Sequence, residues 1–189
     1  LFKSGATGEP KGVEVTHDEE INPVEFLNGY LGIGPADRSL ALSHLECDLS
    51  VCDIFGMLTA GGAIVVVDEA HRRDPDHWAQ QIAAHKVTVL NFLPGWLEML
   101  VEVGNGRLES VRAVPTGGDW VRTAMVRRLQ AQAPGVRLTG LGGATETAVH
   151  ATLYEAGDLP AHWAAVPYGA PFTNNACRVV NSFGADCPD

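Results

Sequence analysis

The sequence predicts an α/β fold, with a mainly parallel β-sheet and helices on both of its faces. Hydrophobic residues make up 46% of the 189 positions and charged residues 19%, a balance typical of a chain that buries a core. Short segments rich in β-branched residues alternate about five times with helical patterns, which indicates βαβ units. Right-handed crossovers between parallel strands then place helices on both sides of the sheet.

The first expected element is a helix that begins at a capping box. Thr16 and Glu19 have the spacing of such a box, and Pro23 either interrupts this helix or restarts it. The later elements are expected to be strands over 39–43, 63–67, 87–91, 111–115 and 136–141, and helices over 50–60, 75–85, 94–103 and 120–133. After residue 156 the pattern predicts loops with a short strand over 178–180.

The charge balance argues against a nucleic-acid partner. Lys and Arg number 13 and Asp and Glu number 23, so the net charge is −10 and a basic footprint is lacking. No apolar run approaches ~18 residues, so we expect no membrane span. The four cysteines form no CxxC pair and no zinc-ligand pattern, which favours a reducing bacterial cytoplasm. The first residues lack an initiator Met and a signal-peptide pattern, which indicates the interior of a longer protein.

A loop near the N-terminus has the composition of a phosphate-binding site. It runs from Ser4 to Gly12 in the order SGATGEPKG. Its three glycines let backbone N–H groups turn toward an anion, while Ser4 and Thr7 add hydroxyl donors and Lys11 adds a positive charge. The spacing differs from that of a P-loop. The alternative interpretation is a flexible Gly/Ser turn with a solvated lysine.

Two further loops follow predicted strands, where ligands bind in parallel sheets. The loop over 142–147 places hydroxyls and a carboxylate beside glycines, which suits a Mg²⁺–phosphate complex. Alternatively, Thr145 or Thr147 caps a turn. In the loop over 47–50, Asp48 can pair with an ammonium group of a substrate. Alternatively, Asp48 or Ser50 is a helix N-cap.

Together these loops resemble the adenylation domain of nonribosomal peptide synthetases, in the ANL superfamily of adenylating enzymes. The segment over 4–12 resembles the family's phosphate loop, and residues 142–146 (GGATE) resemble a later core motif. Asp48 lies in the counterpart of an FDxS segment, with Cys47 in place of Phe. The GGATE, GDW (118–120) and PYG (167–169) segments are similar to the subfamily that follows heterocyclization domains and usually loads cysteine. Many relatives carry an adenine-stacking aromatic residue where this chain has Gly142.

The resemblance implies that residues 1–189 are the central part of the large N-terminal subdomain. This part runs from the phosphate loop to the start of the following β region. The family's ribose-binding aspartate, its hinge, its small C-terminal subdomain with a catalytic lysine, and the carrier protein have no counterpart in the chain. The chain alone is therefore expected to be inactive in adenylation.

The resemblance also implies a reaction: ATP and an amino acid form aminoacyl-AMP and pyrophosphate, and the acyl group passes to a carrier-protein phosphopantetheine. Thr145 and Glu146 are the implied catalytic residues, with Glu146 holding Mg²⁺, and Asp48 is implied to pair with the α-ammonium group. The implied ATP-binding residues are Ser4, Gly5, Ala6, Thr7, Gly8, Lys11, Gly117, Gly118, Gly140, Gly142, Gly143 and Thr145. The implied substrate pocket consists of Asp48, Leu49, Cys52, Asn91, Val114, Thr116, Leu141, Val149 and His150.

This pocket pattern favours cysteine, followed by serine, threonine or α-methylserine. The implied partners are a peptidyl carrier protein, a cyclization or condensation domain of the same synthetase, and an MbtH-like helper protein. Two alternatives stay open. One is an acyl- or aryl-CoA ligase of the same superfamily, whose substrates have no ammonium group for Asp48 to neutralise. The other is a non-catalytic fragment.

Overall fold

The structure is a computed structural model that describes residues 2–3, 9 and 11–187. It begins with a short antiparallel pair, β1 (Phe2–Lys3) and β2 (Lys11–Gly12). Most of the expected phosphate loop, namely Ser4, Gly5, Ala6, Thr7 and Gly8, lies outside the described residues. Over the described part of the chain, no helix combines the length and apolar character needed to cross a bilayer.

Helix α1 (His17–Leu31) begins at the predicted capping box. The Thr16 hydroxyl accepts a hydrogen bond from the Glu19 N–H at 3.3 Å, and the Glu19 carboxylate accepts one from the Thr16 N–H at 2.8 Å. Pro23 lies inside α1 without ending it. The helix buries Pro23, Val24, Leu27 and Leu31. The free energy gained by this burial offsets the backbone hydrogen bond that the proline cannot donate.

The centre of the fold is a parallel sheet. Strand β3 (Arg38–Ala41) pairs with β4 (Ala63–Val66), and β5 (Ala113–Gly117) pairs with β6 (Arg137–Gly142). The two pairs are joined through Val89, which bridges Ser39 on one side and Ala113 on the other in parallel. The strand expected over 87–91 is thus present only as this bridge, because hydrogen bonds to Arg38 and Ala113 involve only residues 88–90.

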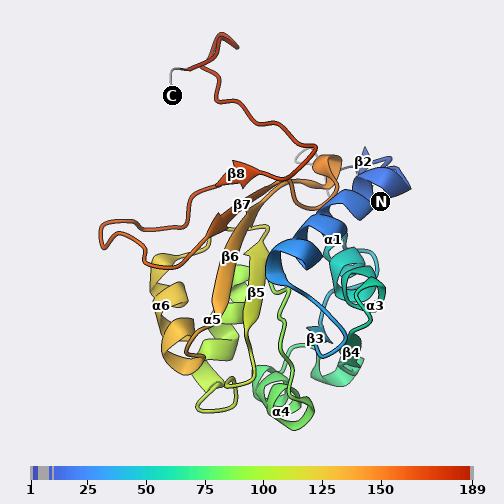
Figure 1. The fold of residues 1–189 in the computed structure, drawn as a ribbon, viewed down its shortest axis with the longest axis vertical. Coiled ribbons are helices and arrows are strands. Elements are labelled where there is room, and N and C mark those ends of the chain that lie inside the picture. Colours follow the sequence, from blue (N-terminus) through green and yellow to red (C-terminus); the bar gives the residue numbers. More distant parts are fainter. Residues whose placement is uncertain (1, 4–8, 10, 188–189) are drawn as a thin grey trace.

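Beyond β6 the sheet continues with antiparallel strands. Strand β7 (Thr152–Glu155) pairs with β6, and β8 (Ala170–Pro171) pairs with β7. The strand expected over 178–180 does not form, and Val180 makes a single bridge to Asp186. This segment extends away from the body of the molecule, so no sheet edge lies beside it to pair with (Figure 1).

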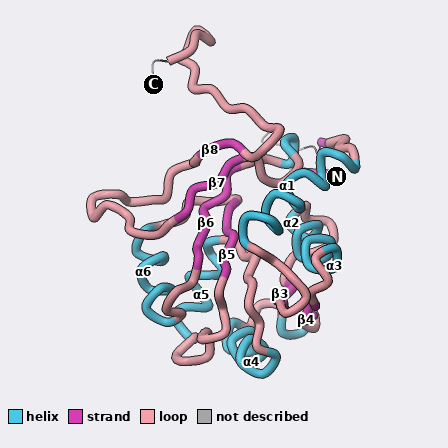
Figure 2. The backbone as a smooth tube through the Cα atoms, viewed as in Figure 1, coloured by secondary structure: helices cyan, strands magenta, loops and turns pink. Residues whose placement is uncertain are grey.

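Helices cover both faces of the sheet, as predicted (Figures 1 and 2). On one face lie α4 (Pro75–His85), α5 (Pro94–Val103) and α6 (Thr123–Gln132), over a large core that includes Leu90, Val114 and Leu138. On the other face lie α1 and the helical segment 49–59, which forms α2 (Leu49–Val51), a π-helical turn η1 (Cys52–Gly56) and α3 (Met57–Thr59). Short 3₁₀ turns η2 (Glu69–His71) and η3 (Thr145–Thr147) complete the helical elements.

Candidate active site

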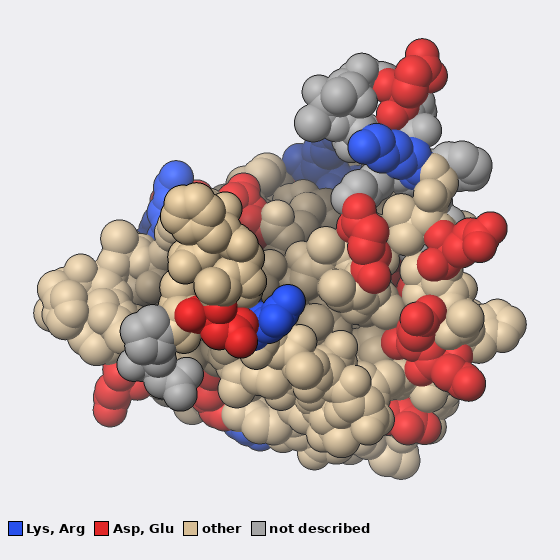
Figure 3. All heavy atoms as spheres, turned by 90° about the horizontal axis from the view of Figure 1, so that it is seen from above, with Lys and Arg blue, Asp and Glu red and all other residues tan. Residues whose placement is uncertain are grey.

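The loops after β3, β5 and β6 meet at one edge of the molecule, because the carboxyl ends of parallel strands share an edge (Figure 1). The predicted site residues that follow these strands therefore lie near one another. Figure 3 looks down on this edge and shows acidic side chains gathered on the side where α1 begins. The first turn of α1 carries Asp18, Glu19 and Glu20, of which Asp18 and Glu19 are exposed.

Asp48 and Thr145 are in direct contact across this edge. The Thr145 hydroxyl donates a hydrogen bond to Oδ2 of Asp48 at 2.8 Å, although the two residues lie 97 positions apart in the sequence. Asp48 precedes α2 but makes no side-chain capping bond. Thr147 serves as the local cap of η3, because its hydroxyl accepts from the Ala144 N–H at 3.0 Å. Asp48 therefore contacts Thr145 instead of capping α2, and the capping hydrogen bond at η3 involves Thr147.

A buried carboxyl group that the sequence analysis missed supports the predicted pocket residue Asn91. The Asn91 amide donates to Oδ1 of Asp53 at 3.0 Å and to the Leu49 carbonyl at 3.1 Å. Asp53 and Asn91 are only 2% and 6% exposed. Burial raises the pKa of Asp53 to about 6. The signal in the sequence was a lone acidic residue within the apolar segment 49–57.

Cys52 and Glu20 are two partly buried titratable groups whose pKa values are both raised by burial and by the charge of Asp48. Burial raises the pKa of the Cys52 thiol to about 12, and the charges of Asp53 and Glu20 act in the same direction. Burial, and then the charge of Asp48, raises the pKa of Glu20. Among the described residues, neither carboxylate oxygen of Glu20 has a hydrogen-bond partner. Sequence analysis missed Glu20, because only the packing of α1 brings it to this site.

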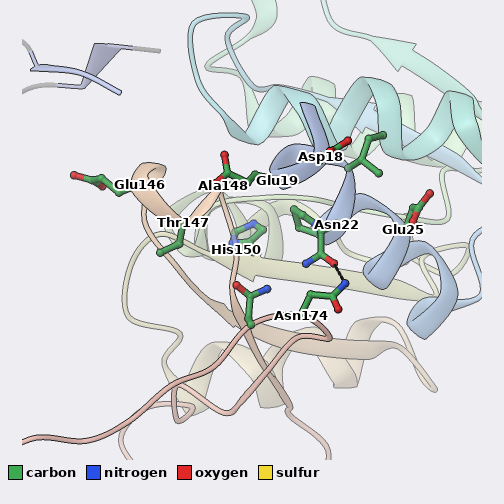
Figure 4. Close-up of a pocket in the computed structure, with 12 residues that line it drawn as sticks. Asp18, Glu19, Asn22, Glu25, Glu146, Thr147, Ala148, His150 and Asn174 are labelled. Carbon is green, nitrogen blue, oxygen red and sulfur yellow. Dashed lines mark hydrogen bonds between the residues drawn. The ribbon is translucent and has the colours of Figure 1, made fainter. Parts of the chain in front are cut away.

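His150 lines a hollow of about 510 Å³ between the start of α1 and the segment 146–150. Figure 4 shows its ring among Asn22 and Asn174, which are hydrogen-bonded to each other at 2.9 Å. His150 is 3% exposed, and its Nε2 has no partner within the described chain. Burial lowers the pKa of His150 to about 4, so the imidazole is neutral at physiological pH.

The residues just before His150 adopt an unusual backbone conformation. Ala148 and Val149 both have positive φ angles, of 53° and 68°. This conformation is sterically costly for a β-branched residue such as Val149. The strained turn carries the chain from η3 back toward β7 and places His150 beside α1.

The remaining predicted pocket residues do not all reach the same side of the sheet. Leu141 packs with Leu27 of α1, on the side of Cys52. Val114 instead belongs to the core under α4–α6, and the Thr116 hydroxyl donates to the carbonyl of Phe92 at 2.7 Å. Pro115, between these two, lines a small cavity of about 30 Å³ together with Cys52, Asp53 and Asn91. Leu49 and Val149 are both buried.

The predicted nucleotide-binding glycines cluster around a separate hollow of about 620 Å³. Gly118, Gly140, Gly142 and Gly143 line it, together with Asp119, Trp120, Val121, Leu141, Val166, Pro167 and Tyr168. Gly117 is buried at the end of β5. Lys11 lies on the exposed β2. Backbone exposed by glycines lets a bulky ligand approach the strand ends closely.

Glu146 occupies an exposed turn directly after Thr145. No group of three His, Cys, Asp or Glu side chains among the described residues could hold a metal ion by itself. Mg²⁺ commonly binds to one or two carboxylates together with substrate phosphates. Glu146 lines the hollow of about 510 Å³ that His150 also lines, and its single carboxylate is a ligand of the type used in that mode of binding.

The comparisons with known proteins identify the family of the chain. The family described as AMP-binding enzyme matches residues 1–189. The chain belongs to the AMP-binding enzyme family, and the resemblance to adenylation domains drawn from the motifs is confirmed.

The relatives include a synthase and a synthetase that are much longer than this chain. The chain is 69% identical over 189 residues to phenyloxazoline synthase MbtB of Mycobacterium sp. (strain MCS), covering all of this chain and 16% of the relative. It is 42% identical over 192 residues to pyochelin synthetase PchE of Pseudomonas aeruginosa, covering all of this chain and 13% of that protein. The chain thus spans only a small part of the curated relatives it matches.

Solved structures show the same fold. The nonribosomal peptide synthetase FmoA3 superposes with a TM-score of 0.86 at 37% identity, over 92% of this chain and 19% of that one. The Vibrio cholerae adenylation domain AlmE, in complex with glycyl-adenosine-5'-phosphate, superposes with a TM-score of 0.87 at 25% identity, over all of this chain and 36% of that one. These neighbours confirm the predicted α/β architecture.

Proposed function

We propose that the chain is the central part of a nonribosomal peptide synthetase adenylation domain that activates a small β-hydroxy amino acid. The substrate carboxylate attacks the α-phosphorus of ATP, the bond to the β-phosphate breaks, and aminoacyl-AMP and pyrophosphate form. The acyl group then passes to the phosphopantetheine thiol of a carrier protein. The contact between Asp48 and Thr145 is the observation that carries this proposal.

The reaction requires two binding groups to be close together. The α-ammonium and the attacking carboxylate are attached to the same carbon of an amino acid, so the group that binds the ammonium must lie near the α-phosphate. In the family, Asp48 corresponds to the ammonium partner and Thr145 to the α-phosphate contact. The distance of 2.8 Å between Oγ1 of Thr145 and Oδ2 of Asp48 supports this assignment. Positioning of this kind accounts for much of the catalysis of such displacements.

The names of the relatives favour a hydroxyl over a thiol among the small substrates that the sequence predicts. An oxazoline ring contains oxygen, which a β-hydroxy side chain supplies, and MbtB is named a phenyloxazoline synthase. FmoA3 has been solved with α-methyl-L-serine-AMP, at 36% identity to this chain. The cavity of about 30 Å³ beside Cys52 and Asn91 also favours a small side chain. We therefore propose serine or threonine as the preferred substrate, ahead of cysteine.

The other parts of the proposal follow the family. The glycine-lined hollow and Lys11 bind ATP, and Glu146 together with the phosphates holds Mg²⁺, which neutralises developing charge. ATP use agrees with the AMPPNP-bound form of FmoA3. Within the whole protein we expect a small C-terminal subdomain, a peptidyl carrier protein, a cyclization or condensation domain and an MbtH-like helper, in the bacterial cytoplasm.

The test is the variant Asp48→Asn in the complete synthetase module, assayed by amino-acid-dependent ATP–pyrophosphate exchange. A charge-assisted hydrogen bond contributes roughly 1.5–3 kcal/mol, so the KM for serine should rise at least about tenfold. ATP binding should change little. The exposed Asp158→Asn is the matched control and should behave as wild type.

Two results would contradict the proposal. Wild-type exchange by Asp48→Asn would remove Asp48 from the substrate site. Exchange that is supported equally by 3-hydroxypropionate and by serine would favour the acyl-CoA ligase alternative, because that acid has no ammonium group. In a panel of amino acids, a preference for cysteine over serine and threonine would overturn the ranking, and a preference for large or basic side chains would overturn the substrate class.

A further inference from the structure

The nucleotide hollow contains aromatic side chains from the GDW and PYG segments, to which the family resemblance assigned no role. The hollow lies at the carboxyl edge between the end of β6, the turn over 118–121 and the segment over 166–168. Its glycines offer backbone rather than side chains, and its two aromatic residues are Trp120 and Tyr168. Both are largely exposed, at 76% and 67%.

The ring of Tyr168 lies against Gly142. A Cβ atom built on Gly142 would lie 2.5 Å from Cδ1 of Tyr168 and even closer to its Cε1. Such a distance is far below van der Waals contact, so the tyrosine ring fills the space into which a side chain at position 142 would project. Position 142 is where many relatives carry their adenine-stacking aromatic residue. A ring is therefore present at this place, although it comes from another segment of the chain.

The backbone around Tyr168 is held firmly while its ring stays accessible. The Thr152 hydroxyl donates to the Tyr168 carbonyl at 2.5 Å, and the Val166 N–H donates to the Val121 carbonyl at 2.9 Å. Gly169 has a φ of +83°, and a Cβ there would overlap the Leu153 carbonyl, so the chain passes tightly over β7. A fixed backbone with an exposed ring suits a stacking surface, because little conformational freedom is lost on binding.

We propose that Tyr168 is the residue that stacks on the adenine ring of ATP, and that it takes the place of the aromatic side chain missing at Gly142. This inference rests on the proposed function, because it assigns a residue to the nucleotide of that reaction. An aromatic ring from any segment of the chain can stack on a base, because stacking requires only a π-face at the right place.

The test compares Tyr168→Leu and Tyr168→Phe in the complete module. ATP affinity is measured directly, without amino acid, by titration calorimetry, and tripolyphosphate serves as a probe that has the phosphates but no base. Tyr168→Leu should weaken ATP binding by roughly 5- to 150-fold, the range expected for one lost stacking contact. Tyr168→Phe should keep wild-type affinity, and tripolyphosphate should bind equally to all three proteins. Phe183→Leu, on the exposed C-terminal segment, is the matched control.

The outcomes are distinguishable from those for the proposed function. Unchanged ATP affinity in Tyr168→Leu would overturn the inference, as would an equal loss of tripolyphosphate binding, which would indicate general damage to the site. A loss of ATP affinity in Trp120→Leu but not in Tyr168→Leu would assign the stacking to Trp120 instead. Failure of the proposed function would appear separately, as a wild-type module that binds ATP but shows no amino-acid-dependent exchange.

Discussion

Folding is expected to exchange a proton between two buried side chains near the substrate pocket, Asp53 and His150. Burial raises the pKa of Asp53 from 3.8 to about 6 and lowers the pKa of His150 from 6.5 to about 4. Between pH 4 and 6 the folded chain therefore holds a proton on Asp53, whereas the unfolded chain holds one on His150. The number of bound protons is the same, so these two groups together make stability nearly independent of pH in this range.

The two contributions have opposite signs. The stability that Asp53 contributes is fully present below pH 3.8 and is lost as the pH rises through about 6, because its pKa is raised on folding. That of His150 is fully present above pH 6.5 and is lost as the pH falls through about 4, because its pKa is lowered. Each shift of about 2 units or slightly more corresponds to roughly 3 kcal/mol at 1.36 kcal/mol per unit.

Replacing one of the two groups should reveal the pH dependence of stability that the other group causes. In Asp53→Asn, the free energy of unfolding should rise by about 3 kcal/mol more than in wild type between pH 4 and 7. In His150→Gln, it should instead fall over the same interval by a similar amount relative to wild type. Urea denaturation at a series of pH values measures both slopes, and the surface variant Asp158→Asn should match wild type. Parallel pH profiles for wild type and both buried variants would refute the reasoning.

Two further predictions concern stability alone. Gly169→Ala should destabilise the fold by at least about 2 kcal/mol in urea denaturation, because its φ of +83° and the overlap with the Leu153 carbonyl both oppose a side chain. Gly157→Ala, where a Cβ meets nothing within 4 Å, is the control, and equal effects at the two positions would contradict this explanation. Thr16→Ala should cost about 1 kcal/mol by removing the cap of α1, whereas Thr16→Ser should retain most of it. A Tm for Thr16→Ala equal to that of wild type would show that the cap contributes nothing.

Local sequence patterns predicted the helices well and the antiparallel part of the sheet poorly. Helices α4 and α5 have the predicted bounds, because Asp74 and two prolines mark their starts and the apolar spacing is regular. Strands β7 and β8 were not predicted, because β7 has only four residues and β8 only two, too few for a recognisable alternating pattern. Strand β7 pairs with β6 and β8 pairs with β7, so the place of β8 depends on a strand that ends at Glu155, 15 residues before β8 begins at Ala170.

In the candidate site, too, residues within local motifs could be predicted, whereas residues placed by distant packing could not. Asp48, Thr145 and Glu146 are carried by compact motifs, so the sequence could identify them. Glu20 and Asp53 reach the site through packing between distant segments, and no motif marks them. Tyr168 lies in the PYG segment, but its position against Gly142 depends on the same kind of packing. Val114 lies toward the other core, because the pleat of β5 sends neighbouring side chains to opposite faces of the sheet.

The distance in sequence between Asp48 and Thr145 has a consequence for the order of folding. Their hydrogen bond closes a loop of 97 residues. The parallel strands β4, β5 and β6, the bridge at Val89 and the helices that connect them must be in place before the two side chains can meet. Contacts of such high separation form late, because the entropy of loop closure must be met before they stabilise the chain. The candidate site is thus a product of the completed sheet, and partly folded forms that lack β6 lack the contact between Asp48 and Thr145. Pulsed hydrogen exchange should show protection of the β6 amides before, and not after, the site can bind ATP.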